Sequence, residues 1–174
     1  MITIISGTNR TNSLSLEVSR YYKAILDDAG TASQILDLSQ LPTDFAFSAL
    51  YANGGKNEKF NTFRSIIEES QKFIFVVPEY NGSFPGVLKA FIDGLKYPDS
   101  FSGKKALLVG ISSGIQGSTL ALSHLNDILN YLNMHVYGTR LKIPMVEKNF
   151  TNGVITDAKI LDLAQAQLKG FLKF

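Results

Sequence analysis

Short apolar runs alternate along the chain with longer stretches whose apolar residues recur at helical spacing. The runs at 2–6, 72–77 and 105–111 are continuous, which is typical of strands that are buried on both faces of a sheet. The stretches between them place apolar side chains three or four residues apart, as in amphipathic helices. We expect strands at 2–6, 32–38, 72–77, 105–111 and 134–138, and helices at about 13–29, 58–70, 84–97, 120–132 and 157–172.

Strands that alternate with helices in this way indicate a parallel sheet with right-handed crossovers. Of the two common doubly wound arrangements, the flavodoxin-like strand order 2-1-3-4-5 suits a chain with five strands. We therefore predict an α/β three-layer sandwich that forms a single domain over residues 1–174. Ligands of such folds bind beyond the carboxyl ends of the strands, so the loops after strands one, three and four are the candidates for a binding site.

The loop after the first strand collects hydroxyl, amide and guanidinium groups directly before a helix. It runs from Gly7 to Ser15 and includes Thr8, Arg10 and Ser13. A helix N-terminus offers unpaired backbone N–H groups at the positive end of the helix dipole, and an arginine suits phosphate oxygens. We predict a cradle for one phosphate monoester. The alternative is an ordinary turn in which Ser13 caps the helix.

Two better-known phosphate-binding motifs are absent from this loop. It has no lysine followed by Ser or Thr, which a P-loop needs, and Gly7 is its single glycine, whereas the dinucleotide fingerprint needs three. Asp37 ends the second strand, where a ribose-binding acid would stand in a dinucleotide site. Without the glycines, we interpret Asp37 as a loop or capping residue.

The loops after the third and fourth strands have compositions that constrain the backbone. Residues 78–86 contain two prolines and two glycines, and a rigid loop of this kind can present N–H and C=O groups to a flat heterocycle such as a flavin, with Tyr80 against a ring face. A well-made turn and helix cap is the alternative. Residues 110–118 are rich in Gly and Ser, which lets the backbone approach a ligand closely but is also common in simple turns.

Composition excludes several classes of function. The net charge is +2 and the basic residues are scattered, so we expect no nucleic-acid partner. The chain has no cysteine, which excludes disulfides, thiolate catalysis and cysteine-based metal sites. No apolar run could span a bilayer and the chain begins directly with a strand, so we expect no membrane partner and a cytoplasmic location. His124 and His135 lack a third metal ligand at suitable spacing, and we expect structural or surface roles for them.

The connection at 42–57 is long for a compact domain and carries Phe45, Phe47, Leu50 and Tyr51. Connections of this length are usually functional or disordered, and so many large apolar side chains argue against disorder. We expect the connection to cover the edge of a bound cofactor or to enter a subunit interface.

Taken together, the three loops resemble those of the NADPH-dependent FMN reductase family, whose members include azo, quinone and chromate reductases on a flavodoxin-like fold. The family's first motif, Gly-Ser-x-Arg-x-x-Ser, is similar to residues 7–13, with threonine in place of the first serine. Its second, Pro-Glu-Tyr-Asn-Gly-Ser-x-Pro-Gly-x-Leu-Lys, is matched from Pro78 through Lys89. Its third, Ser-x-Gly-x-x-Gly-Gly, is similar to residues 112–118, where Ser118 replaces the last glycine. The resemblance covers roughly residues 2–171.

The resemblance implies that FMN binds across the three loops. The residues that would contact it form three groups, for the phosphate, for the isoalloxazine ring, and for the ribityl chain or ring: Thr8, Arg10, Ser13, Leu14 and Ser15; Pro78, Glu79, Tyr80, Asn81 and Gly82; and Ser112, Ser113 and Gly114.

The resemblance also implies an oxidoreductase that passes hydride from NADPH through FMN to a small-molecule acceptor in a ping-pong cycle. No catalytic side chain is expected, because the flavin carries the chemistry. Family members are commonly homodimers or homotetramers. Two alternatives remain on the same fold. One is a flavodoxin-type electron carrier, although such carriers favour a strongly acidic surface for docking. The other is a flavin-free binding or regulatory protein.

Overall fold

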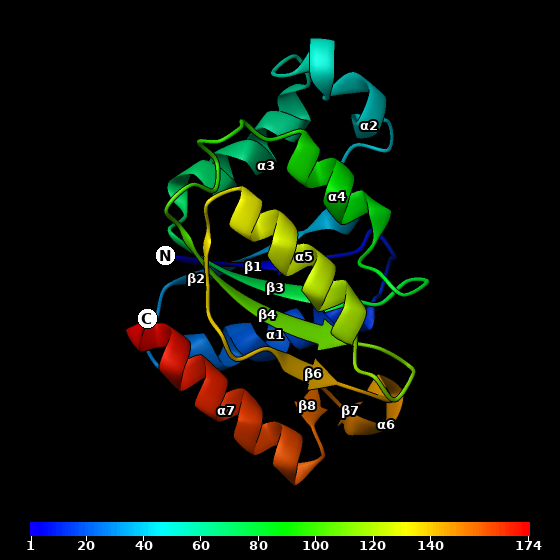
Figure 1. The fold of residues 1–174 in the computed structure, drawn as a ribbon, viewed down its shortest axis with the longest axis vertical. Helices are drawn as coiled ribbons and strands as arrows, with labels where there is room; N and C mark the ends of the chain where they lie inside the picture. The colour runs from blue at the N-terminus through cyan, green and yellow to red at the C-terminus, as the bar shows by residue number, and fades with distance from the viewer.

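A parallel sheet forms the centre of the computed structural model, which describes residues 1–174 (Figure 1). Its strands run in the order β2-β1-β3-β4-β5, with β6 also paired to β4, so the predicted order is confirmed. The strands are β1 (Ile2–Ser6), β2 (Ser33–Asp37), β3 (Lys72–Pro78), β4 (Lys105–Ile111), β5 (His135–Val136) and β6 (Leu141–Ile143), with a separate hairpin of β7 (Phe150–Thr151) and β8 (Val154–Ile155).

Helices cover both faces of the sheet and complete the three predicted layers (Figure 1). The long helices are α1 (Leu14–Asp28), α3 (Glu58–Glu69), α4 (Gly86–Asp93), α5 (Thr119–Tyr131) and α7 (Ala158–Lys173), and the short ones are α2 (Phe45–Ser48), α6 (Val146–Asn149) and the 3-10 turns Leu38–Gln40 and Tyr51–Asn53. None of the helices is both long and apolar enough to cross a bilayer.

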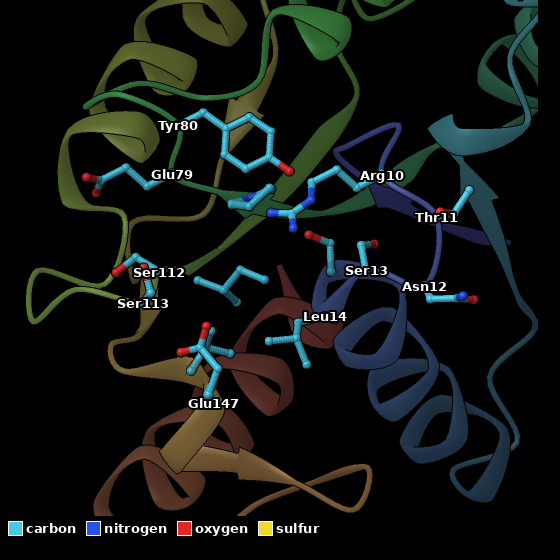
Figure 2. A pocket seen from close by; sticks show the side chains of 14 residues that line it. Arg10, Thr11, Asn12, Ser13, Leu14, Glu79, Tyr80, Ser112, Ser113 and Glu147 are labelled. Atoms are coloured by element: carbon cyan, nitrogen blue, oxygen red, sulfur yellow. The ribbon is translucent and has the colours of Figure 1, made fainter.

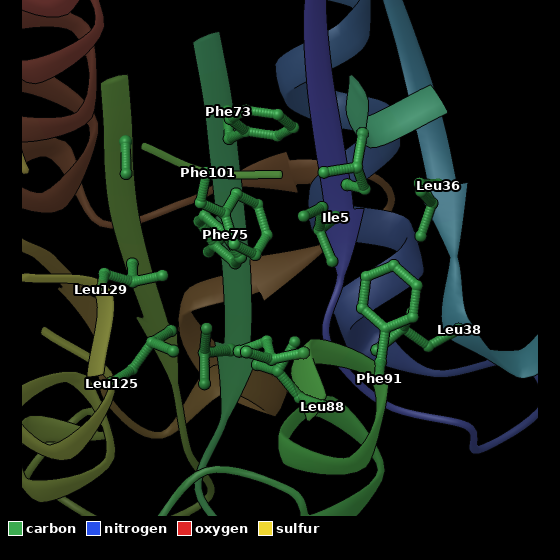
Figure 3. Packing of buried hydrophobic residues seen from close by; sticks show 14 of the residues in the cluster. Ile5, Leu36, Leu38, Phe73, Phe75, Leu88, Phe91, Phe101, Leu125 and Leu129 are labelled. Carbon is green, nitrogen blue, oxygen red and sulfur yellow. The ribbon is translucent and has the colours of Figure 1, made fainter. Parts of the chain in front are cut away.

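Alternate residues of each central strand enter two different cores. Phe73, Phe75 and Val77 pack with α3, α4 and α5 on one face (Figure 3). Ile74 and Val76, from the same strand, pack with α1 and α7 on the other face. Because side chains of a strand alternate between the faces, a strand that is apolar at every position requires helices on both sides. The two cores hold the sheet rigid, so the loops at its carboxyl edge start from fixed positions.

The fifth strand differs from the prediction at 134–138, because it is split into β5 and β6. These segments pair with the beginning and the end of β4, and the backbone between them leaves the sheet. Gln167 of α7 fills the break: its side-chain amide donates to Leu108 O at 3.0 Å and to Thr139 O at 2.8 Å. Gln167 is buried, so these bonds replace strand pairing that the backbone does not supply.

The connection at 42–57 is ordered by its own apolar side chains. Phe45 and Leu50 are buried, and the Phe45 ring stacks on that of Phe60 in α3 with a centroid distance of 5.7 Å. Phe47 and Tyr51 are each 84% exposed. The segment is therefore anchored in the core while it presents two aromatic side chains on the surface.

The carboxyl edge of the sheet is shaped by a close contact at Gly110 in β4. A β-carbon there would lie 2.7 Å from Gly117 O and 2.8 Å from Ser118 Cβ. Ser118 is buried with a φ of 70°, and its hydroxyl donates to Val77 O. The loop from β4 to α5 therefore folds back onto its own strand, which only glycine at this position permits.

We expect Gly110→Ala to destabilise the protein by about 1–3 kcal/mol, as overpacking of a close-packed contact typically does. Thermal unfolding followed by circular dichroism measures the effect. Gly138→Ala is the matched control, because a β-carbon at Gly138 meets nothing within 4 Å. Equal melting temperatures for the two variants would contradict this account of the loop.

Candidate active site

An open cleft lies at the carboxyl edge of the sheet, where β1, β3 and β4 end (Figure 2). Its empty volume is about 670 Å³, counted with the open solvent at its mouth. Residues from all three predicted loops and from α6 line it: Arg10, Thr11, Asn12, Ser13, Leu14, Ser15, Pro78, Glu79, Tyr80, Ile111, Ser112, Ser113, Val146 and Glu147. The topological rule that placed the site at this edge is therefore met.

The N-terminus of α1 forms one wall of the cleft. Ser13 caps the helix, because its hydroxyl accepts from Leu16 N at 3.2 Å. The five backbone N–H groups of residues 11–15 donate to no acceptor within the protein. Arg10 is exposed at the same end of the helix and takes part in no salt bridge. Free amides, a helix dipole and a guanidinium at one point make a site for an anion.

Thr8 and Tyr80 lie in different loops and share a hydrogen bond of 2.7 Å between their hydroxyls. Thr8 is fully buried, and its oxygen also accepts from Arg10 N at 3.3 Å. Figure 2 shows the Tyr80 hydroxyl directed toward Arg10, across the top of the cleft. The Thr8 hydroxyl therefore joins the first and second loops, and its predicted contact with a phosphate stays a prediction.

The second loop contains a tight turn from Tyr80 to Ser83. The backbone N–H of Tyr80 donates to Ser83 O at 2.8 Å, and that of Ser83 donates to Tyr80 O at 3.1 Å. Asn81 and Gly82 have φ values of 51° and 76°, the combination that a type I′ turn requires and that Asn-Gly favours. The Ser83 hydroxyl bonds His124 Nδ1 at 3.0 Å, which anchors the turn to α5.

The third loop is held by the chain that follows β6. Ser112 N donates to Ile143 O at 3.2 Å, while Val146 N donates to Ser112 O at 2.9 Å. Met145 N donates to Gly114 O at 3.0 Å. These bonds bring α6 to the cleft, where Glu147 faces the side occupied by Tyr80 and Glu79 (Figure 2).

Sequence reasoning missed Glu147 and Val146. The error came from placing the fifth strand at 134–138. The strand pairing continues to Ile143, and the residues that follow Ile143 therefore lie at the same edge of the sheet as the other loops. The signal that could have found it is the alternation of Leu141 and Ile143 followed by Pro144.

The structure brings most of the predicted site residues together. Those that line the cleft are Arg10, Ser13, Leu14, Ser15, Pro78, Glu79, Tyr80, Ser112 and Ser113, and those that do not are Thr8, Asn81, Gly82 and Gly114. Asn81, Gly82 and Gly114 belong to turns at its rim and keep backbone N–H groups that bond no protein acceptor. Their contacts with a ligand stay predictions.

The other candidate residues have local structural roles. The Asp37 carboxylate accepts from Ser39 N at 3.0 Å and caps a 3-10 turn, as its interpretation as a capping residue predicted. His124 holds the Tyr80–Ser83 turn, and His135 is exposed at the start of β5. No group of three or more His, Asp or Glu side chains is placed to hold a metal ion.

Comparison with known proteins decides the family. The sequence profile of the NADPH-dependent FMN reductase family matches residues 1–147. The chain belongs to this family. Members are NAD(P)H-dependent oxidoreductases that use FMN, which identifies the class of enzyme and its cofactors.

Relatives of this reductase carry names from the same family. An NAD(P)H-dependent FMN reductase, PA1204, of Pseudomonas aeruginosa is 32% identical over 89% of this chain and 88% of its own length. An FMN-dependent NADPH-azoreductase of Staphylococcus saprophyticus is 31% identical over 74% of this chain and 69% of its own length. The NADH:FMN oxidoreductase EMOB, in its apo form, superimposes with a TM-score of 0.82 at 22% identity, covering 99% of this chain and 89% of that chain. An archaeal flavodoxin shares the fold with a TM-score of 0.59.

The cleft fits FMN by the chemistry of its donors. A phosphate monoester needs several hydrogen-bond donors and positive charge, and the wall formed by α1 supplies free N–H groups, the Ser13 and Ser15 hydroxyls and Arg10. A flat ring with alternating donors and acceptors needs backbone groups that are not already paired, and the turns at 81–82 and 113–114 retain them.

We expect Tyr80→Phe to weaken FMN binding by about threefold to tenfold, because a lost neutral hydrogen bond costs about 0.5–1.5 kcal/mol. Fluorescence titration of FMN measures the effect, and Tyr131→Phe, an exposed tyrosine at the end of α5, is the control. In a Thr8→Val background the Tyr80→Phe change should have little further effect. If the effects of the two substitutions on the free energy of FMN binding were fully additive, the bond between Thr8 and Tyr80 would not position the loops.

Proposed function

We propose that this reductase transfers hydride from NADPH through FMN bound in the cleft to a small-molecule acceptor by a ping-pong cycle. The proposal rests on one observation: loops from three separate strands and the free amides of α1 line a single open cleft. When bound, FMN accepts hydride from the nicotinamide and passes it on to the acceptor. A single open cleft suits donor and acceptor that visit in turn.

Arg10, Ser13 and Ser15 are the residues that would hold the phosphate. Arg10 is exposed and free to form charge-assisted bonds, while Ser13 is the N-cap of α1 and Ser15 lies in the first turn of that helix. Thr8 would support the phosphate site indirectly, because its hydroxyl bonds the Tyr80 hydroxyl and accepts from the backbone N–H of Arg10. Its proposed role is to fix the shape of the cradle.

The loops at 78–82 and 112–114 would hold the isoalloxazine ring and the ribityl chain. Pro78 and Glu79 continue β3 into the cleft, and Glu79 N donates to Ile111 O at 3.0 Å, which ties the second loop to the end of β4. The free N–H groups of Gly82 and Ser113 are candidates to face the pyrimidine edge of the ring. Preorganised donors at that edge stabilise negative charge that develops there.

The proposed acceptor is a flat, small oxidant of the kind named for the relatives. A 2-hydroxy-1,4-benzoquinone reductase of a Burkholderia species is 29% identical over 76% of this chain, and the azoreductase of S. saprophyticus is 31% identical over 74% of this chain. Among the lining side chains none is a histidine or a cysteine, which suits chemistry carried by the cofactor.

The proposal includes a homodimer or homotetramer in the cytoplasm. Two exposed aromatic features support assembly: Phe47 and Tyr51 on the 42–57 connection, and the stacked rings of Tyr97 and Tyr131 beside an apolar groove between α4 and α5. Apolar patches of this kind mark protein interfaces. No nucleic acid or membrane takes part in the proposed reaction.

Anaerobic addition of NADPH to the FMN-loaded protein tests the proposal. We expect the visible flavin absorbance to bleach within seconds and to return when a quinone is added in the absence of oxygen. Bleaching that requires an added flavoprotein reductase would indicate an electron carrier instead. A protein that takes up no FMN would contradict both the reductase and the electron-carrier hypotheses, and a flavin-free role would remain.

A further inference from the structure

Two carboxylates line the cleft without any partner in the protein. Glu79 and Glu147 form no salt bridge, and their side chains accept no hydrogen bond. The remaining acidic groups of the chain lie outside the cleft, and several are paired, as Asp27 is with Lys23. Figure 2 shows Glu79 on the side of Tyr80 and Glu147 on the opposite side, with Ser112 and Ser113 between them.

The backbones that carry these carboxylates are fixed. Glu79 N is bonded to Ile111 O, and α6 is held to the third loop through the amides of Met145 and Val146. Met145 has a φ of 42°, and Val146 is buried. A residue other than glycine keeps a left-handed backbone conformation only where the surrounding structure enforces it. The fold therefore fixes the position of Glu147 at the cleft.

Positive charge does not balance the two carboxylates. Arg10 is the single basic residue among those that line the cleft, and the proposed phosphate site uses it. Lys148 follows Glu147 in α6 but is exposed and does not line the cleft. The part of the cleft left for an acceptor therefore faces two negative charges.

We propose that Glu79 and Glu147 determine the charge class of the electron acceptor: they select uncharged or cationic flat oxidants and reject anionic ones. The inference rests on the proposed function. An acceptor must touch the bound ring to receive hydride, so any charge it carries lies in the cleft, within about a Debye length of both carboxylates. The adenosine end of the nicotinamide donor extends away from the reacting ring and is less subject to this effect.

The size of the effect follows from Coulomb's law. Two like charges about 7 Å apart, at an effective dielectric constant between that of water and that of a protein surface, disfavour binding by about threefold to several tens of fold for each carboxylate. Because the cleft is open, screening by salt places the effect toward the lower end. Discrimination against an anionic acceptor should therefore weaken as ionic strength rises.

An uncharged naphthoquinone and its sulfonated derivative test the proposal on the FMN-loaded enzyme. Dissociation constants come from the perturbation of flavin absorbance in the oxidised protein, without turnover, and kcat/KM is measured alongside. We expect Glu147→Gln to improve binding of the sulfonated quinone about threefold to tenfold relative to wild type, with the uncharged quinone unchanged. Comparing variant with wild type cancels the difference in reduction potential between the two quinones.

Glu79→Gln should also raise the affinity for the sulfonated quinone relative to that for the uncharged quinone, and in the double variant the two fold-changes in this ratio should approximately multiply. Glu69→Gln, an exposed glutamate at the end of α3, is the matched control and should change neither constant. Each variant is used at saturating FMN, with its FMN affinity measured separately.

An unchanged ratio of the two quinones in Glu147→Gln and Glu79→Gln would overturn the inference while leaving the proposed function intact. A wild-type protein that NADPH does not reduce would instead overturn the proposed function. An equal gain in affinity for both quinones would also count against the inference. It would indicate that the substitution widens access to the cleft and does not act through charge.

Discussion

The whole site depends on unpaired backbone N–H groups at the start of α1, held at the carboxyl edge of a parallel sheet. A helix leaves its first amides without internal partners, and here those of residues 11–15 find none elsewhere in the protein. Parallel pairing of β1, β3 and β4 brings the ends of all three strands to the same edge. The loops that complete the cleft are thus adjacent because of topology, although about seventy residues of sequence separate the first from the second.

Rigidity of this edge comes from contacts that join the loops to one another and to the rest of the fold. Gly110 lets the third loop fold back onto β4, the hydroxyls of Thr8 and Tyr80 join the first and second loops, and His124 ties the Tyr80–Ser83 turn to α5. Each contact joins two loops or joins a loop to the scaffold. A ligand that binds across the loops then has little backbone left to order, which favours affinity.

Much of this architecture could be predicted from the sequence, because continuous apolar strands and amphipathic helices leave few ways to bury both faces of a sheet. The strand order and the edge that carries the site followed from the alternation together with the known arrangements of doubly wound sheets, and Ser13 and Asp37 could be recognised as caps. The split fifth strand could not, since the amide that fills its break comes from Gln167, far along the chain. The pairing of Thr8 with Tyr80 and the arrival of Glu147 at the cleft are likewise products of tertiary structure, which local patterns do not encode.

The most direct test of the account compares the affinities of FMN and riboflavin, which differ only in the phosphate. We expect FMN to bind at least about 100-fold more tightly, since charge-assisted hydrogen bonds contribute about 1.5–3 kcal/mol each. Arg10→Ala should remove about tenfold or more of that preference. Arg20→Ala, on the exposed face of α1 where Arg20 pairs with Glu17, should leave it unchanged. Equal affinities for FMN and riboflavin in the wild-type protein would contradict the account, because the start of α1 would then not hold the phosphate.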